Sequence, residues 1–254
     1  MAEEPEIPNE TEAMEIHKPK PVHSWRELLT EIGVVVIGVC IALGAEQTVE
    51  TLHNRARAAE ARASVRQEIA RNLGNMDVRV ATEACMTARL DVGQGLIAAS
   101  AASRLPPETL WIGHPIAPGP VDGNYKTATQ SGAASLLNDK EQAAYAMLYG
   151  QFTLYALTLH EEARAWADLR TLETHPQPSA TLDWQLRSAM QQARTARYYI
   201  NFIRQLALQE AADIGVTPAE RDKLKMPPVC VPIHTAHEEA AKLSVTPGYD
   251  LPIP

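Results

Sequence analysis

One apolar segment near the N-terminus constrains this chain more than any other feature. Residues 32–45 contain only aliphatic, glycine, alanine and cysteine side chains, without a single charge. Leu28, Leu29 and Val49 extend the segment at its ends, and a helix over residues 28–49 would be about 33 Å long. Because a helix of roughly 20 apolar residues crosses the hydrocarbon core of a bilayer, the segment predicts a transmembrane anchor.

Three alternatives to an anchor are weaker. The small residues at Ala42 and Gly44 would suit a cleaved signal peptide, but the preceding leader is long and acidic, and helical patterning continues beyond the cleavage point. A lipoprotein motif needs a small residue before its cysteine, whereas Val39 precedes Cys40. A helix buried in a soluble core rarely has apolar residues all round. We therefore expect a membrane span over residues 24–49.

The predicted span has one face of small residues. At about 100° per residue, Glu31, Gly38, Ala42 and Ala45 lie within about 40° of one line along the helix. Gly38 and Ala42 have the small-xxx-small spacing that lets two membrane helices approach closely, and a carboxylate such as Glu31 prefers a partner to lipid. We interpret this face as a packing surface for a second copy or another membrane protein. The alternative is that small residues are common in any membrane helix.

The sequence outside the span divides into three further parts. Residues 1–23 contain six glutamates and four prolines without apolar periodicity, which is typical of a disordered acidic tail, and we expect that tail in the cytoplasm. Residues 50–215 are expected to form an extracytoplasmic helical bundle. Residues 216–254 are expected to form a short helix, starting at Thr217, and a proline-rich C-terminal tail.

Helical periodicity dominates the predicted bundle. No proline occurs between Ser24 and Arg104, so one long helix is expected to continue from the anchor, with a bend near Gly74 or Gly93. Residues 105–124 contain five prolines and three glycines and are expected to be an irregular loop. The arginines of residues 55–71 alternate with alanine and glutamate, a pattern typical of a solvated stalk.

Two more long helices are expected after the loop. Asn138 and Glu141 have the spacing of a capping box, which predicts a helix from there to about Glu173. Another helix is expected from near Thr181 to the natural stop at Gly215. No alternation typical of strands occurs. The predicted fold class is therefore all-α, with one N-terminal transmembrane helix continuing into a bundle of about three long helices, plus the irregular loop and the tail.

The cysteines indicate the compartment. Cys40 lies in the apolar segment, which leaves Cys85 and Cys230 as a single pair in the large domain. Such a pair is typical of a disulfide in an oxidising compartment, although two unrelated buried thiols would give the same sequence. Lysines and arginines are equally frequent on both sides of the span and do not orient it. We therefore expect a single-pass protein of the bacterial cytoplasmic (inner) membrane, with its large domain in the periplasm.

The composition and motifs argue against nucleic-acid binding and catalysis. A net charge of −8 would repel a nucleic acid. The glycines around Gly93 fall inside a helical stretch, not in the strand-to-helix turn of a dinucleotide site. Adjacent carboxylates, such as Glu161 and Glu162, are interpreted as solvated. No nucleophile elbow occurs. We expect no catalytic residue, no cofactor and no enzyme activity.

One cluster near the C-terminus contains the residue types that bind zinc. Cys230, His234, His237 and Glu239 could supply thiolate, imidazole and carboxylate ligands, but their spacing matches no established site, and a disulfide would use Cys230. We expect no metal there. If the protein were an enzyme, a metal-assisted site at the two histidines would be the best candidate.

Aromatic residues follow the two later helices. One stripe runs from Tyr145 to Trp166, and Trp184, Tyr198 and Phe202 follow on the next helix. These residues could line a ligand pocket between the helices, but packing in the core explains them more simply.

Two stretches also resemble a known group of proteins. The anchor sequence from Glu27 to Leu43, and the Ser131-Gly132 segment followed by a helix containing Tyr145 and Tyr149, are similar to bacterial single-pass membrane proteins. In that group a glycine-rich span leads into a helical domain of unknown function. The resemblance implies membrane anchoring and a helical domain, and it implies no activity.

These features favour a role in protein interaction. We expect a membrane-anchored envelope scaffold or accessory subunit that acts without catalysis and forms a homo-oligomer or binds another membrane protein. The alternative is a periplasmic sensor of a small ligand that signals through the transmembrane helix.

Overall fold

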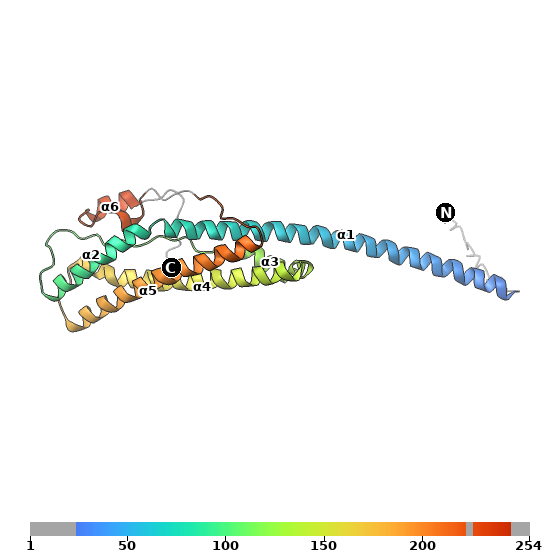
Figure 1. Cartoon of the computed structure of the whole chain (residues 1–254), viewed down its shortest axis with the longest axis horizontal. Coiled ribbons are helices and arrows are strands. Elements are labelled where there is room, and N and C mark those ends of the chain that lie inside the picture. The colour runs from blue at the N-terminus through green and yellow to red at the C-terminus, as the bar shows by residue number, and fades with distance from the viewer. Residues whose placement is uncertain (1–23, 222–225, 245–254) are drawn as a thin grey trace, which may run out of the picture. The chain divides into compact units, whose positions relative to one another are not determined.

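The computed structural model describes residues 24–221 and 226–244. All regular elements in these ranges are helices, and none of the described residues forms a strand, so the predicted all-α class is confirmed (Figure 1). The chain divides into two compact units between His53 and Asn54. The predicted cytoplasmic tail, residues 1–23, and the last residues of the predicted C-terminal tail lie outside the described residues.

The first unit contains the N-terminal part of helix α1 (Trp25–Val80). Its apolar segment is long and apolar enough to cross a membrane, and none of that segment is buried within the protein. The valine and isoleucine side chains of this part, together with Leu29, Leu43 and Leu52, are all strongly exposed. An all-round apolar surface of this kind is stable in lipid and unstable in water, which agrees with the predicted span.

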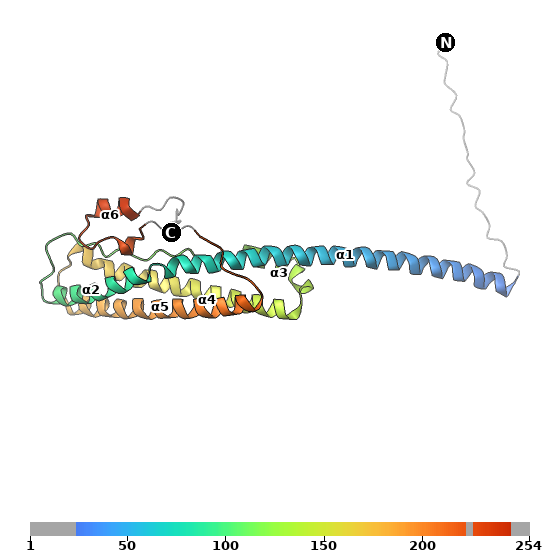
Figure 2. The same ribbon diagram turned by 45° about the horizontal axis from the view of Figure 1, so that its top comes forward.

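The second unit is a helical bundle. It contains the C-terminal part of α1 and helices α2 (Glu83–Ala101), α3 (Gly123–Gln130), α4 (Asp139–Leu169), α5 (Ala180–Asp213) and α6 (His237–Ser244). The α4 and α5 helices form an antiparallel hairpin, and α1 and α2 follow one another along one side of this hairpin (Figures 1 and 2). The bundle therefore contains three long helical segments: α4, α5, and the end of α1 followed by α2. The third segment is broken between α1 and α2.

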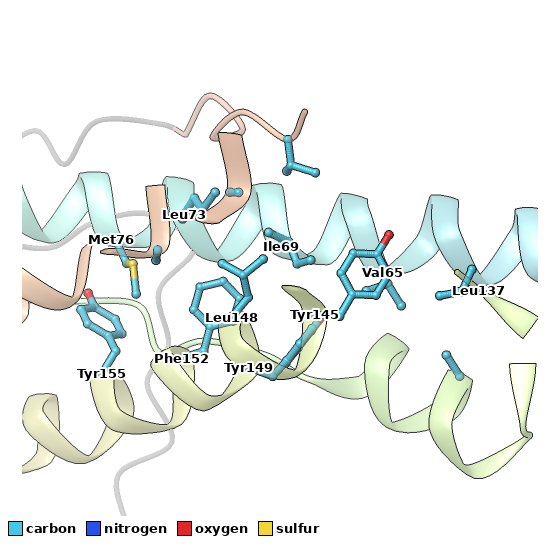
Figure 3. Close-up of a cluster of buried hydrophobic side chains, with 14 of the residues drawn as sticks. Val65, Ile69, Leu73, Met76, Leu137, Tyr145, Leu148, Tyr149, Phe152 and Tyr155 are labelled. Carbon is cyan, nitrogen blue, oxygen red and sulfur yellow. The ribbon is translucent and has the colours of Figure 1, made fainter. Parts of the chain in front are cut away.

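Two apolar clusters form the core of the bundle. In the first, one stripe of α1 packs against α4, as Figure 3 shows, and against α5; its members include Val65, Ile69, Leu73, Met76, Tyr145, Leu148, Tyr149, Phe152, Tyr155, Ile200 and Ile203. In the second, α2 takes the place of α1; its members include Met86, Leu90, Trp166, Leu169, Leu172, Leu186 and Met190. The hairpin is thus common to both clusters, which explains why its buried stripes run almost its full length.

The helix ends follow local capping chemistry. The Asn138 side chain accepts a hydrogen bond from the backbone N–H of Glu141 at 2.9 Å, so α4 begins where the capping pattern predicts. Ser179 caps α5 in the same way, through the N–H of Leu182 at 3.1 Å. After α5, Gly215 adopts the left-handed conformation (φ 67°) that favours glycine, and the predicted stop is confirmed.

The predicted bend at Gly74 or Gly93 is wrong, because the break falls at Ala81 and Thr82. The Thr82 hydroxyl donates to the carbonyl oxygen of Arg79 at 2.7 Å, and the Thr82 N–H bonds to the same carbonyl, which closes a tighter turn in place of the helical bond. Gly74 instead allows the segment around Ala219 to pack closely against α1. A Cβ there would lie 2.3 Å from the carbonyl oxygen of Ala219.

The short helix expected from Thr217 is also wrong for the described residues. Residues 216–221 are irregular, and residues 222–225 lie outside the described part of the chain. The Ala219 N–H donates to the carbonyl oxygen of Ala70 at 2.8 Å. The backbone of this segment is therefore hydrogen-bonded to α1 and does not form a helix. The short helix of the C-terminal region is α6.

Candidate interaction surfaces

The structure exposes the predicted packing face of the anchor. Glu31, Gly38, Ala42 and Ala45 all lie on the helical part of α1 and all are exposed. A Cβ added at Gly38 would meet no atom within 4 Å. Since α1 is regular throughout this region, the four residues keep the common side that the helical spacing predicts. Among the described residues, none covers this side.

The structure pairs Cys85 and Cys230 as a disulfide, as the sequence predicts. Their Cα atoms lie 5.0 Å apart, and the bond joins α2 to the segment that precedes α6. Cys40, in the anchor, is free and exposed. The bond removes the Cys230 thiolate from the possible zinc ligands, and no group of three metal-ligating side chains is found in the part of the chain that the structure describes.

A buried arginine holds the long loop and the C-terminal segment beside the disulfide. The guanidinium of Arg89 donates to the carbonyl oxygens of Trp111, Ile112 and Val231. Burial lowers the pKa of Arg89. On the other side, a Glu173 carboxylate oxygen accepts from the N–H of Ile112 at 2.8 Å. The loop predicted as irregular is therefore fixed by charged side chains, which satisfy backbone groups that no helix or strand satisfies.

A buried ion pair joins α1 to α4. Arg79 and Glu162 are almost completely buried and form two hydrogen bonds, one of 2.9 Å between Nε and Oε2. Burial raises the pKa of Glu162, and the hydrogen bonds from Arg79 oppose this effect. The interpretation of Glu162 as a solvated carboxylate is wrong. Its partner lies 83 residues away in the chain, and no local pattern indicates that contact.

Three arginines of α5 form ion pairs with neighbouring helices. Ion pairs join them to acids of α1 and α2, and the pairs are Arg194 with Asp91 at 3.9 Å, Arg197 with Glu83 at 3.2 Å and Arg204 with Asp77 at 2.6 Å. We call the surface of α5 that carries these arginines the charged side of α5. Nearly every charge in the middle of α5 is thus directed toward α1 and α2.

The interpretation of residues 55–71 as a solvated stalk is also partly wrong. Arg57 donates to the carbonyl oxygen of Ser131 at 2.7 Å. Arg62 forms two hydrogen bonds with Glu141, of 2.6 and 2.8 Å, and these bonds lower the pKa of that carboxyl. This part of α1 is therefore fastened to the start of α4.

A buried carboxylate attaches α3 to α1. Glu68 is almost completely buried and accepts from the backbone N–H of Asn124 at 2.8 Å and of Tyr125 at 3.1 Å. It also accepts from the Tyr149 hydroxyl, whose pKa is raised by burial and by this bond. The negative charge thus lies at the N-terminus of α3, where the unpaired N–H groups of a helix favour an anion.

The aromatic residues divide into a buried and an exposed set. The stripe from Tyr145 to Trp166 is buried in the core, which was the simpler of the two interpretations. The structure leaves Trp184 69% exposed, Tyr198 66% exposed and Phe202 nearly half exposed, so core packing is wrong for these three. The rings of Tyr198 and Phe202 stack on each other at 6.4 Å on the surface.

Exposed apolar residues of α4 complete a patch with these aromatics. A groove lined by Glu161 and Arg164 of α4 and by Thr195 and Tyr199 of α5 shows which parts of the two helices are opposite. One or two turns further, Leu154 and Leu157 must lie beside Tyr199, Phe202 and Leu206. We call this patch the α4–α5 face; its members are Met147, Leu154, Leu157, Tyr198, Tyr199, Phe202 and Leu206.

The members of the α4–α5 face carry no charge, and Glu161 and Arg164 border the face at the groove beside Tyr199. Residues 142–159 of α4 contain no acidic or basic side chain, and the only charges of α5 between residues 188 and 209 are the three arginines of its charged side. The rim of the face on α5 consists of exposed amides, at Gln191, Gln192, Gln205 and Gln209. Exposed helical surfaces usually carry charges, so a wide apolar face of this kind is unusual on a surface in water.

Fold and surfaces together define an all-helical protein that has a candidate membrane-spanning helix and a disulfide-linked bundle. Comparison of the chain with protein-family models, curated proteins and solved structures finds no match to any of them.

Proposed function

We propose that this protein is a membrane-anchored scaffold or accessory subunit of the bacterial envelope that acts by binding other proteins and not by catalysis. The observation that carries the proposal is the α4–α5 face, which is apolar, uncharged and exposed on the bundle. A soluble surface rarely keeps so many apolar side chains in water unless a partner covers them. The small-residue face of the anchor supports the same role within the membrane.

The proposed location is the inner membrane, with the bundle in the periplasm. The apolar part of α1 supports the anchoring, and the disulfide between Cys85 and Cys230 supports an oxidising compartment. Thiol labelling of intact cells with a reagent that does not cross membranes tests this location. Labelling of both cysteines only after reduction is expected, whereas thiols that react only after cell lysis would contradict it.

Chemical crosslinking in native membranes tests the proposed role. We expect the chain to be crosslinked into a complex larger than its own 27.8 kDa. Leucine at both Gly38 and Ala42 is expected to weaken that complex, because bulky side chains keep the backbones of two helices apart. The matched control places leucine at Val36 and Cys40, on the opposite side of the same helix. A chain that remains monomeric in the membrane would contradict the proposed role.

A sensor of small ligands is the second candidate. A cavity of about 470 Å³ lies between the end of α1 and the C-terminal segment, lined among others by Asp77, Thr82, Pro218 and Cys230. Its volume is in the range of small-molecule sites, and α1 is the helix that contains the candidate span. A metabolite that raises the melting temperature of the full chain would support this candidate. A broad set of metabolites without any such shift would count against it.

A further inference from the structure

We propose that the partner of the α4–α5 face is a second copy of this chain, so that two bundles pair through the same face. The inference rests on the proposed function, because it names the partner of a surface already assigned to binding. A contact of this kind is isologous: each copy contributes the same residues, related by a two-fold axis.

The size of the face fits a dimer. Seven apolar side chains are between 38% and 66% exposed. They present on the order of 700 Å² of surface, close to the ~800 Å² per partner of a standard protein interface. Three of the seven are aromatic, and tyrosine and phenylalanine are enriched at the centres of interfaces.

The distribution of charge permits a copy of the same chain as the partner. Residues 54–254 contain 20 lysines and arginines and 21 aspartates and glutamates, so two bundles carry almost no net charge to repel each other. The arginines of α5 are paired with acids of α1 and α2, so they do not face the arginines of a second copy.

The rim of the face is compatible with itself. The exposed amides of Gln191, Gln205 and Gln209 can each donate and accept a hydrogen bond. An amide at the rim therefore finds a partner in whichever rim amide of the second copy it meets. An apolar centre with an amide rim on α5 thus suits a second copy.

Membrane anchoring lowers the affinity that such a contact needs. Two anchored copies share one membrane plane, which raises their effective concentration far above that of free molecules. A face of standard size without charged pairs is then sufficient for pairing.

Site-specific photo-crosslinking of the full chain in its membrane tests the inference. A photoreactive phenylalanine analogue replaces Phe202, and a second, differently tagged copy without the analogue is expressed with it. The expected product joins the two tags. Leu157→Glu in both copies is expected to reduce the product at least tenfold. The matched control is Val92→Glu on α2, since Val92 is 48% exposed and lies outside the face.

A charge-swap experiment separates a lost contact from a folding defect. One copy carries Leu157→Glu and the other Leu157→Lys, and the opposite charges are expected to restore the product that either variant loses when paired with itself. Formation of the Cys85–Cys230 bond is followed in every variant as a sign of folding.

Each remaining outcome has a defined meaning. A product unchanged by Leu157→Glu overturns the pairing of two copies through this face, and recovery of the product in the charge swap supports it. A product that joins Phe202 to a different protein overturns the dimer and leaves the proposed scaffold role intact. No product with any protein contradicts both.

Discussion

Two sides of α5 differ in their chemistry: one faces α1 and α2, and the other faces outward. Toward α1 and α2, α5 presents Arg194, Arg197 and Arg204, each paired with an acid. Toward the outside, the same helix presents tyrosine, phenylalanine, leucine and uncharged amides. Helix α5 also buries an ordinary apolar stripe that includes Ile200 and Ile203, but its outer side lacks the charges that a solvent-exposed helix face usually carries.

The difference shows how the bundle uses its charges. The ion pairs of α5 are partly exposed, with arginine side chains between 27% and 34% exposed, so each pair adds little stability but matches one residue of α5 to one residue of α1 or α2. The charged side of α5 therefore belongs to the inside of the bundle, and the members of the α4–α5 face form no ion pair.

Removal of a buried charge should cause the largest loss of stability. Arg79→Met leaves the Glu162 carboxylate buried without a partner, and we expect the free energy of unfolding to fall by about 3–5 kcal/mol. Arg79→Met combined with Glu162→Leu should recover most of the loss, because no buried charge remains. Denaturant unfolding of the full chain in detergent, followed by circular dichroism, measures both. A single variant as stable as the parent would show that the pair is dispensable.

Loss of the disulfide should rank next. Cys85→Ser with Cys230→Ser opens a link across 145 residues, and we expect a loss of about 2–4 kcal/mol. The melting temperature with and without reductant measures the effect. Reductant should lower the melting temperature of the parent and leave that of the double variant unchanged. Cys40→Ser is the control and should not change the stability, because Cys40 is free and exposed.

The stability contributed by the Arg62–Glu141 pair should be smaller and should depend on pH. The Arg62 hydrogen bonds lower the pKa of Glu141 in the folded state below its ordinary value of 4.5. The stability from this pair is therefore present above pH 4.5 and is lost as pH falls through the lower folded pKa. Glu141→Gln should cost about 1 kcal/mol at neutral pH, since Arg62 is 36% exposed and solvent weakens the pair.

The measurement for this pair is the difference in unfolding free energy between the parent and Glu141→Gln at several pH values. That difference should be constant above pH 4.5 and shrink below it. A difference that grows as the solution becomes more acidic would mean that the pKa of Glu141 is shifted in the opposite direction.

The outer face of the hairpin should contribute least to folding. Leu157→Glu changes the stability of the dilute, monomeric protein by less than about 0.5 kcal/mol, because Leu157 is 59% exposed. Unfolding in detergent at low protein concentration measures this. A loss above 2 kcal/mol would indicate that the face is needed for the fold of one copy, and the contrast between the two sides of α5 would disappear.

Local chemistry made much of the fold predictable. The apolar segment, the capping pattern at Asn138, the glycine stop at Gly215 and the lone pair Cys85 and Cys230 all act through near neighbours or simple counting, and the structure agrees with each of them.

The features that were missed depend on distant partners. The break at Thr82 replaces an expected bend at a glycine, and Gly74 is small because the segment around Ala219 packs against it. The burial of Glu162 depends on Arg79, and the exposure of Tyr198 depends on which side of α5 its arginines occupy. A pattern along one helix shows that two sides differ, but it does not show which side another helix will cover.

The long span of the disulfide also orders the events of maturation. Cys230 is made 145 residues after Cys85, which corresponds to roughly 7–30 s at ordinary rates of chain elongation. During that interval the final partner of Cys85 has not yet been made, whereas α4 and α5 are both made before Cys230. The bond can therefore close only after the hairpin of the bundle has been synthesised.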